Sequence, residues 1–430
     1  MLTLLILLLF ITTLLATSDV GHFWIINDVH YQWNYEVGSD PETVCISGAG
    51  SAGTFGDHSC CSPSSLMLSA LSFMKETHPN PDFVTFLGDI IPQRSVLKHT
   101  EFNKEILKNV LAHFTSKLEK TFPGTPLINL LGNHDIIPAH QFSPLTRYIF
   151  KDTLDLWAPY IPKDQHENYL HGGYYRMDLT ERLTILVLNT NYYFTMDFET
   201  IPNHDPSHQF KWIESEMKRL IKTDRKALVF CHIPPGPFDP FAATVSNFQP
   251  QFNSKFLDSL QEGFRHSRVL SMFSGHQHSS SFRLLWDYKN DNVAAPLFIS
   301  PAVVPIGDGP TEVLSWSGNN PGVRLYKYNK TSGVVLDYTQ YYLNLTESNI
   351  LLKDEWKVEH SGTTLFKVVD FSAKSSLKAF ENLANDKGLL QKYIKSTTVG
   401  LEFDLTSKCY VRHLCAIRHV GMVDFYKCYI

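Results

Sequence analysis

Short apolar runs, rich in β-branched and aromatic residues, recur from residue 23 to about residue 304, and amphipathic stretches separate them. This alternation is typical of layered α/β proteins, in which helices cover buried strands. The sequence therefore predicts an α/β fold. The predicted strands are Phe23 to Ile26, Phe83 to Leu87, Leu127 to Leu131, Leu183 to Leu188, Ala227 to Phe230 and Val269 to Phe273.

Two proline-containing turns predict where helices begin. Ser62-Pro63 is expected to open a helix toward Lys75, with the proline at the first helical position. Asp205-Pro206 is expected to open another helix, whose apolar residues recur at helical spacing and belong to the core. Those residues are Phe210, Ile213, Met217 and Leu220.

A short polar motif follows five of the predicted strands at their carboxyl ends. In layered α/β proteins ligands gather outside the carboxyl ends of the strands, so motifs far apart in sequence are expected to meet at one edge. The motifs are Asn27-Asp28-Val29-His30, Gly88-Asp89, Gly132-Asn133-His134-Asp135, Cys231-His232 and Gly275-His276-Gln277-His278.

These motifs supply the ligands for a pair of divalent cations. Two cations about 3.5–4 Å apart need a bridging anion, and Asp89 is the candidate. Because alternate residues of a strand share one face, we expect Asp28 and His30 to reach one ion, and His276 and His278 to point to one side. Nitrogen and oxygen ligands without a thiolate favour Zn²⁺ or a similar first-row ion. The predicted ligands are Asp28, His30, Asp89, Asn133, His232, His276 and His278.

Each motif alone also has an ordinary structural interpretation. Gly-Asp after a strand is commonly a turn, His-x-His a strand pair and Asn-His-Asp a loop. The appearance of all five in this order, each after an apolar run, favours the metal site.

The first 18 residues predict a cleaved secretory signal peptide, because an apolar segment from Met1 to Ala16 precedes small residues. The alternative, an uncleaved anchor, needs about 20 apolar residues. No later run reaches that length, so no transmembrane segment is expected. We predict a secreted or extracellular protein, with the lysosome or another lumen as the alternative. Asn329 and Asn344 begin Asn-x-Thr sequons and are predicted glycosylation sites.

Charge and cysteines restrict the partners and the compartment. The formal net charge of -5 gives no electrostatic reason to bind a nucleic-acid polymer. Six of the seven cysteines form two clusters, which suggests local disulfides in an oxidising compartment, with a connectivity that the sequence leaves open. Cys231, beside His232, is expected to be a buried hydrophobic residue pointing away from the metals. The clusters are Cys45, Cys60 and Cys61, and Cys409, Cys415 and Cys428.

A boundary is predicted near Thr346. Strand-like segments from Val323 to Tyr328 and from Gly333 to Tyr342 precede it, and helical segments ending in cysteines follow it. We therefore expect a catalytic domain over residues 19–345 and a helical, disulfide-stapled subdomain over residues 346–430.

Taken in order, the motifs resemble the calcineurin-like metallophosphoesterase superfamily, and more narrowly the acid sphingomyelinase-like phosphodiesterases. The narrower resemblance covers almost the whole mature chain. It rests on Gly56-Asp57 with Cys60 and Ser62-Pro63, Pro81-Asp82-Phe83, Gly172-Gly173-Tyr174-Tyr175, Leu188-Asn189-Thr190-Asn191, His232-Ile233-Pro234-Pro235-Gly236, Gly318-Asn319-Asn320-Pro321-Gly322, Tyr341-Tyr342-Leu343-Asn344-Leu345-Thr346 and Cys415-Ala416-Ile417.

The resemblance implies a two-sheet sandwich flanked by helices, with two Zn²⁺ per chain. His134 would face the phosphate, and Asp135 would orient it through a hydrogen bond, which makes both predicted catalytic residues. The implied disulfides are Cys45–Cys60 and Cys415–Cys428. The implied ligands are Asp28, His30, Asp89 and His278 for one ion, and Asp89, Asn133, His232 and His276 for the other.

The chain departs from the family pattern at three points. Gln93 stands where the family commonly has a His four residues after the second-motif Asp, and an amide cannot donate a proton as an imidazolium does. Leu405 replaces the usual partner of Cys409, which leaves a Cys61–Cys409 bridge, thiols or intermolecular pairing as alternatives. Acid sphingomyelinases carry a saposin-like domain before the catalytic domain, whereas here Phe23 follows the signal almost at once, which favours soluble substrates.

The sequence thus predicts a secreted, monomeric, dinuclear-metal phosphodiesterase. It is expected to hydrolyse phosphodiester or phosphoanhydride bonds of soluble small molecules such as nucleotides by metal-activated hydroxide. The alternatives are a sphingomyelin phosphodiesterase, a phosphomonoesterase and a secreted pseudoenzyme that binds phosphorylated ligands.

Overall fold

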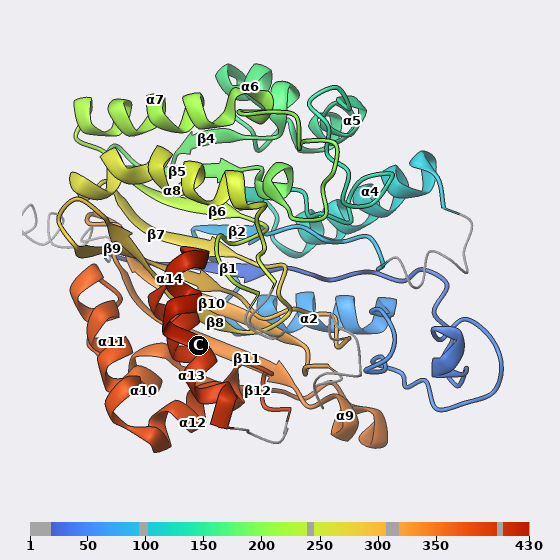
Figure 1. The fold of residues 1–430 in the computed structure, drawn as a ribbon. Coiled ribbons are helices and arrows are strands. Elements are labelled where there is room, and N and C mark those ends of the chain that lie inside the picture. Colours follow the sequence, from blue (N-terminus) through green and yellow to red (C-terminus); the bar gives the residue numbers. More distant parts are fainter. Residues whose placement is uncertain (1–18, 94–101, 239–244, 307–317, 402–406, 430) are drawn as a thin grey trace, which may run out of the picture.

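Two six-stranded mixed sheets pack face to face, and helices flank them, as expected (Figure 1). The computed structural model describes residues 19–93, 102–238, 245–306, 318–401 and 407–429, so the predicted signal peptide lies outside the described residues.

The first sheet has the strand order β12-β11-β10-β1-β2-β3. Strands β1, β2 and β3 are parallel, and β10, β11 and β12 join them antiparallel. Its strands are β1 (Val20–Ile26), β2 (Phe83–Phe86), β3 (Leu127–Asn129), β10 (Gly322–Asn329), β11 (Val335–Leu343) and β12 (Trp356–Ser361).

The second sheet has the order β4-β5-β6-β7-β9-β8. Its middle strands are parallel, and an antiparallel strand closes each edge. Its strands are β4 (Tyr175–Asp178), β5 (Leu183–Leu188), β6 (Lys226–Cys231), β7 (Val269–Ser274), β8 (Ser281–Asp287) and β9 (Asn292–Ile299).

Aromatic side chains fill the space between the sheets. Phe23 of β1 stacks on Phe83 of β2 at 4.5 Å and meets Phe273 of β7 edge to face at 5.4 Å. Such ring contacts stabilise the fold by about 0.5–1.5 kcal/mol each, in addition to the burial of the apolar area of the rings. Ile26 pairs with Phe86 in the first sheet, and Phe230 with Phe273 in the second, so parallel strands end level with one another.

The helices form two groups around the sheets. Helix α8 packs on β7, β8 and β9, while α11 contacts β9 and α13 contacts β8. Helices α10 to α14 lie together, drawn in red and orange in Figure 1. The helices are α2 (Ser64–Thr77), α4 (Lys104–Thr121), α5 (Tyr148–Trp157), α6 (His166–Gly172), α7 (Gln209–Lys222), α8 (Pro250–Arg265), α9 (Leu345–Leu351), α10 (Gly362–Phe366), α11 (Ala373–Asn385), α12 (Lys387–Ser396), α13 (Ser407–Arg418) and α14 (Met422–Tyr429), with short 3₁₀ turns at Pro41–Thr43, Lys163–Gln165, Thr190–Tyr193 and Pro206–His208.

Two helix starts differ from the prediction. Pro63 is the N-cap of α2 rather than its first helical residue, because its ψ of 164° is extended. After Asp205 the chain makes a 3₁₀ turn before α7 begins, and the Asp205 carboxylate instead accepts hydrogen bonds from the N–H groups of Phe210 and Lys211.

The C-terminal region contributes to both helices and sheet. After residue 345 the chain forms α9 to α14, but β12 also lies there and pairs with β11 of the first sheet. The domain boundary at Thr346 remains a prediction. Cys45–Cys60 and Cys415–Cys428 are disulfides, and no described helix is long and apolar enough to cross a membrane.

Candidate metal centre

The seven predicted ligands lie together at the carboxyl ends of strands from both sheets, and all are buried. Six of them form two compact sets of three, in each of which the ligand atoms lie within 4.8 Å of one another. The seventh, Asn133, places its Oδ1 2.9 Å from Nε2 of His232. The sets are Asp28, His30 and His278, and Asp89, His232 and His276.

The backbone at five of the seven candidate ligands is left-handed, with φ between 44° and 71°, which residues other than glycine rarely adopt. This corrects the expectation from strand alternation. Asp28 and His30 do share a set, but they lie beyond the end of β1, and His276 and His278 fall in different sets. The left-handed residues are Asp28, His30, Asp89, His276 and His278.

Backbone carbonyls hold three of the imidazoles. Nδ1 of His30 lies 2.6 Å from the Ile91 carbonyl oxygen, and Nδ1 of His232 lies 2.7 Å from that of Leu87. A carbonyl only accepts, so Nδ1 carries a proton in both rings, and in the neutral form of each ring Nε2 has a lone pair. His278 is held in the same way by Ile306 at 2.9 Å.

The freed Nε2 atoms converge. Those of His30 and His278 are 3.1 Å apart, and Nε2 of His276 is buried without a hydrogen-bond partner among the described residues. Two lone pairs at this distance repel unless a cation lies between them. These residues therefore fit the divalent ions that the motifs imply, and the fixed tautomers are those of metal-binding histidines.

Asp89 faces both sets. Its Oδ2 lies 3.1 Å from Nε2 of His232 and 3.7 Å from Nε2 of His30, while Oδ1 accepts the backbone N–H of His134 at 2.7 Å. Although burial opposes its charge, His232 and His134 hold the pKa of Asp89 well below its usual value. This placement supports the predicted bridging role.

Burial sets the charge of the remaining imidazoles. It lowers the pKa of His30 to about 3 and that of His276 well below the ordinary value. His232 is the exception: burial lowers its pKa, but Asp89 outweighs this effect and raises it to about 9. Neutral imidazoles at His30 and His276 thus lie beside an ionised Asp89, whereas His232 would have to release its Nε2 proton before a cation could bind there.

Asp135 does not orient His134, contrary to the prediction. Its carboxylate accepts four backbone N–H groups, and Nδ1 of His134 has no partner among the described residues. Burial, followed by the nearby Asp89 charge, raises the pKa of Asp135 to about 7. Because its donors come from two loops, Asp135 connects the loop after β2 to the loop after β3. The four donors, at 2.8–3.1 Å, are Asp89, Ile90, Ile91 and Gly132.

Three rings that the sequence did not point to border the site. The His140 ring lies 4.6 Å from the His134 ring, and Phe194 contacts both His140 and His276, at 5.6 and 4.9 Å. Phe238 contacts His276 at 5.8 Å. A histidine seven residues after Asn133, in the same polar loop, was the available signal for His140.

Gln93 and Cys61 meet beside the site. The Gln93 side chain is buried, and its backbone N–H points to Sγ of Cys61 at 3.4 Å. Cys61 and Cys409 are buried thiols, so the alternative Cys61–Cys409 bridge is not formed. Cys231 is a buried thiol as expected.

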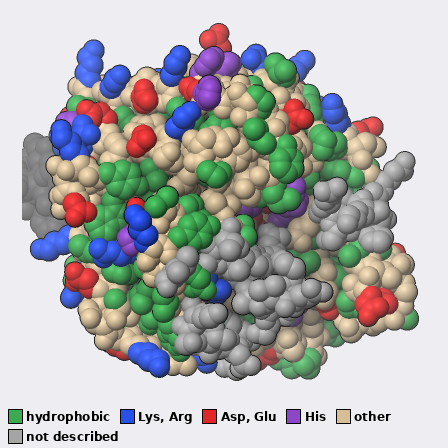
Figure 2. Space-filling model, in the orientation of Figure 1, with side chains coloured by type: hydrophobic (Ala, Val, Ile, Leu, Met, Phe, Trp, Pro, Cys, Tyr) green, Lys and Arg blue, Asp and Glu red, His purple; other side chains and the backbone are tan. Residues whose placement is uncertain are grey.

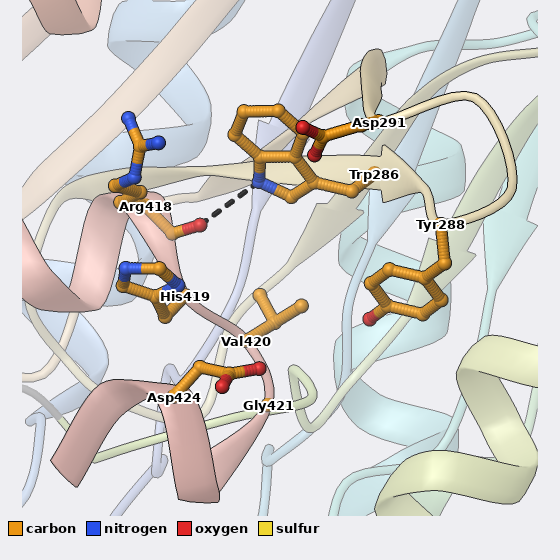
Figure 3. A pocket seen from close by; sticks show the side chains of 8 residues that line it. All are labelled: Trp286, Tyr288, Asp291, Arg418, His419, Val420, Gly421 and Asp424. Atoms are coloured by element: carbon orange, nitrogen blue, oxygen red, sulfur yellow. Dashed lines mark hydrogen bonds between the residues drawn. The ribbon is translucent and has the colours of Figure 1, made fainter. Parts of the chain in front are cut away.

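A separate cavity of about 210 Å³ lies between the β8–β9 turn and the α13–α14 turn (Figure 3). None of the predicted ligands lines it. Its wall includes Trp286, whose indole N–H donates to the Arg418 carbonyl oxygen at 2.9 Å. Histidine side chains are instead visible near the centre of the face in Figure 2, beside hydrophobic ones.

Two protein families match this chain, each over a different part of it. The calcineurin-like phosphoesterase family matches residues 21–280, and the C-terminal region of acid sphingomyelin phosphodiesterase matches residues 292–430. The first match contains all seven ligand positions.

Individual relatives extend over nearly the full chain. Acid sphingomyelinase-like phosphodiesterase 3b of Mus musculus is 31% identical over 96% of this chain and 91% of its own. Cyclic GMP-AMP phosphodiesterase SMPDL3A of Bos taurus is 31% identical over 95% and 91%. Sphingomyelinase phosphodiesterase C of Dictyostelium discoideum is 28% identical over 95% and 93%.

The fold and the buried Asp, Asn and His set are those of a metal-dependent phosphodiesterase, which hydrolyses phosphoric diesters. Within that class, the chain belongs to the calcineurin-like phosphoesterase family, in its acid sphingomyelinase-like phosphodiesterase branch.

Proposed function

We propose that this protein is a secreted or luminal phosphodiesterase that uses two Zn²⁺ to hydrolyse phosphodiester or phosphoanhydride bonds of soluble substrates such as nucleotides. The observation that carries the proposal is the convergence of imidazole Nε2 atoms around Asp89. The proposed ligands are Asp28, His30, Asp89 and His278 for one ion, and Asp89, Asn133, His232 and His276 for the other.

When bound, the two ions would supply Lewis acidity and would lower the pKa of a bound water enough for it to serve as the nucleophile near neutral pH. The chain's own residues position the substrate. His134 is almost completely buried beside the His30 ring, at 5.0 Å, and burial keeps the pKa of its imidazole well below the ordinary value. We assign its neutral N–H to a hydrogen bond with a phosphoryl or leaving-group oxygen.

A nucleotide-type substrate is supported by the rings around His276. Phe194 and Phe238 are 6% and 9% exposed and pack beside the second set, where their uncovered edges would offer a nucleobase or another flat group apolar contact. The names of relatives that act on cyclic GMP-AMP agree with such a substrate.

Sphingomyelin is the second candidate, favoured by one observation. Met196, Phe198 and Ile201 are 45%, 64% and 51% exposed and follow Phe194 in the chain. Such an apolar rim would suit a lipid substrate. Relatives named as sphingomyelinases keep this candidate open.

The test is a substrate panel on purified, metal-analysed protein: a cyclic dinucleotide, a nucleoside triphosphate, p-nitrophenyl mono- and diesters, and sphingomyelin vesicles. We expect two zinc equivalents and fastest turnover of the soluble diester and anhydride. Asp89→Asn should lose at least about 100-fold in activity, since even residues that only orient ligands contribute about 10–100-fold.

Three outcomes would replace the proposal. Preference for the monoester would indicate a phosphomonoesterase, preference for vesicles a sphingomyelinase, and metal binding without turnover a pseudoenzyme. Glycan mapping at Asn329 and Asn344 of protein collected from the medium tests the secretory route.

A further inference from the structure

We infer that His140 is a positioning residue that turns the Asn133 amide so that its oxygen faces the second metal set. Nδ1 of His140 lies 2.9 Å from Nδ2 of Asn133, while Oδ1 of the same amide lies 2.9 Å from Nε2 of His232. The NH₂ end of the amide thus donates to one imidazole, while its oxygen end faces another. This inference rests on the proposed function.

The chemistry of an amide makes its orientation matter. The oxygen can ligate a cation, but the NH₂ group only donates hydrogen bonds, so a flipped Asn133 could not be a ligand. Because Nδ2 donates, Nδ1 of His140 must accept, and the neutral ring carries its proton on Nε2. Among the described residues, His140 is the hydrogen-bond partner of Nδ2, so without this acceptor that end of the amide would no longer distinguish the two orientations.

His140 itself is held firmly. Its backbone N–H donates to the Asn133 carbonyl oxygen at 2.7 Å, which closes the loop between the two residues. The Phe194 ring packs edge to face against it at 5.6 Å. The next residue, Gln141, donates a side-chain hydrogen bond from Nε2 to the Met196 carbonyl oxygen at 2.8 Å. The imidazole is therefore fixed from its backbone, from one ring and from the next residue.

The test replaces His140 by Phe and by Asn. Phe keeps a ring against Phe194 but has no acceptor, whereas Asn places an acceptor oxygen at the same position along the side chain as Nδ1. His208→Phe is the matched control, because His208 is also a left-handed histidine, with φ of 52° against 72°, and lies exposed against His171. Backbone strain is therefore similar in both Phe variants.

Metal-free proteins are titrated with Zn²⁺, and the affinity for the second equivalent is measured beside kcat. We expect His140→Phe to bind the second ion about 10–100-fold more weakly, as loss of a ligand-orienting residue does. His140→Asn and His208→Phe should stay within about threefold of the unmodified protein. Excess Zn²⁺ should restore kcat of His140→Phe, which a merely misfolded variant would not show.

Equal affinity of His140→Phe and the unmodified protein for both ions would overturn the inference, as would His140→Asn falling as far as His140→Phe. If the unmodified protein itself fails to bind two ions, the proposed function fails first. Should His140→Phe not fold, His140→Leu carries the same comparison.

Discussion

Gln93 is the residue at which the resemblance to the family implies a histidine instead, and its side chain is buried. Restoring an imidazole there by Gln93→His should accelerate esters with poor leaving groups, because general-acid help contributes about 10²–10⁴-fold. Aryl diesters and anhydrides, which leave without protonation, should change little. Measuring kcat for an alkyl and a p-nitrophenyl diester checks this, and equal effects on both would show that position 93 does not supply the proton.

Asp197 makes the stability depend on pH. Its buried carboxylate accepts the N–H groups of Phe142 and Glu199, and burial raises its pKa from 3.8 to about 8. A carboxyl group whose pKa is higher in the folded than in the unfolded state stabilises the fold at pH values below its unfolded pKa. This stabilisation is lost as the pH rises through the folded pKa. The free energy of unfolding should therefore fall between about pH 4 and 8, by up to about 1.4 kcal/mol per pH unit.

Urea unfolding of the metal-free protein at several pH values measures that slope. Asp197→Asn should flatten it, whereas Asp155→Asn, at an exposed position, should leave it unchanged. The same slope in both variants would exclude Asp197 as its source.

The sequence motifs indicated which residues belong to the candidate metal site. They did not indicate how the side chains of those residues are oriented. The seven candidate ligands could be picked out because each follows an apolar run, and the structure brings them together. Their orientation could not, because it depends on left-handed turns and on contacts such as Asp135 with Asp89, 46 residues away.

At the scale of elements, glycines allow the motif loops to approach one another. A Cβ on Gly132 would overlap Oδ1 and the backbone nitrogen of Asp89. Gly132→Ala should thus displace Asp89 and weaken zinc binding at least about 10-fold, although it removes no ligand. Calorimetric titration with Zn²⁺ checks this.

Gly388→Ala in α12 is the control, because its Cβ would contact only Asp386, at 3.4 Å. It should leave zinc affinity unchanged and stabilise the helix by about 0.5–1 kcal/mol. Unchanged affinity in Gly132→Ala as well would mean that the loops can shift apart at no cost.

Strands were easier to predict than helix starts. Buried parallel strands are almost continuously apolar, which is why Leu183 to Leu188 was predicted at its observed bounds. Helix starts depend on local capping, and a turn such as Pro206–His208 interposes residues that a proline signal does not reveal.

At the scale of the whole molecule, the candidate metal centre draws its residues from both sheets. Asp28, Asp89 and Asn133 follow strands of the first sheet, whereas His232 and His276 follow strands of the second. Removing the metals should destabilise the fold, since a ligand at 100 times its Kd contributes about 2.7 kcal/mol. Thermal unfolding with and without a chelator measures the effect, and Asp89→Asn should not respond to the chelator.

The two-sheet architecture was predictable through the family resemblance, but the strand order was not. Periodicity identifies strands without their neighbours. The pairing of β12 with β11 brings residues beyond the predicted domain boundary into the first sheet, which no local pattern indicates.

The left-handed backbone at Asp28, His30, Asp89, His276 and His278 bears on how such a protein could change over time. Each non-glycine residue in this conformation lowers the free energy of unfolding by about 1–2 kcal/mol. Together the five residues lower it by an amount comparable to the net stability of a whole domain. A lineage released from catalysis would become more robust by accepting glycine at any of them. A descendant with glycines there would be recognisable as a former hydrolase that kept its scaffold.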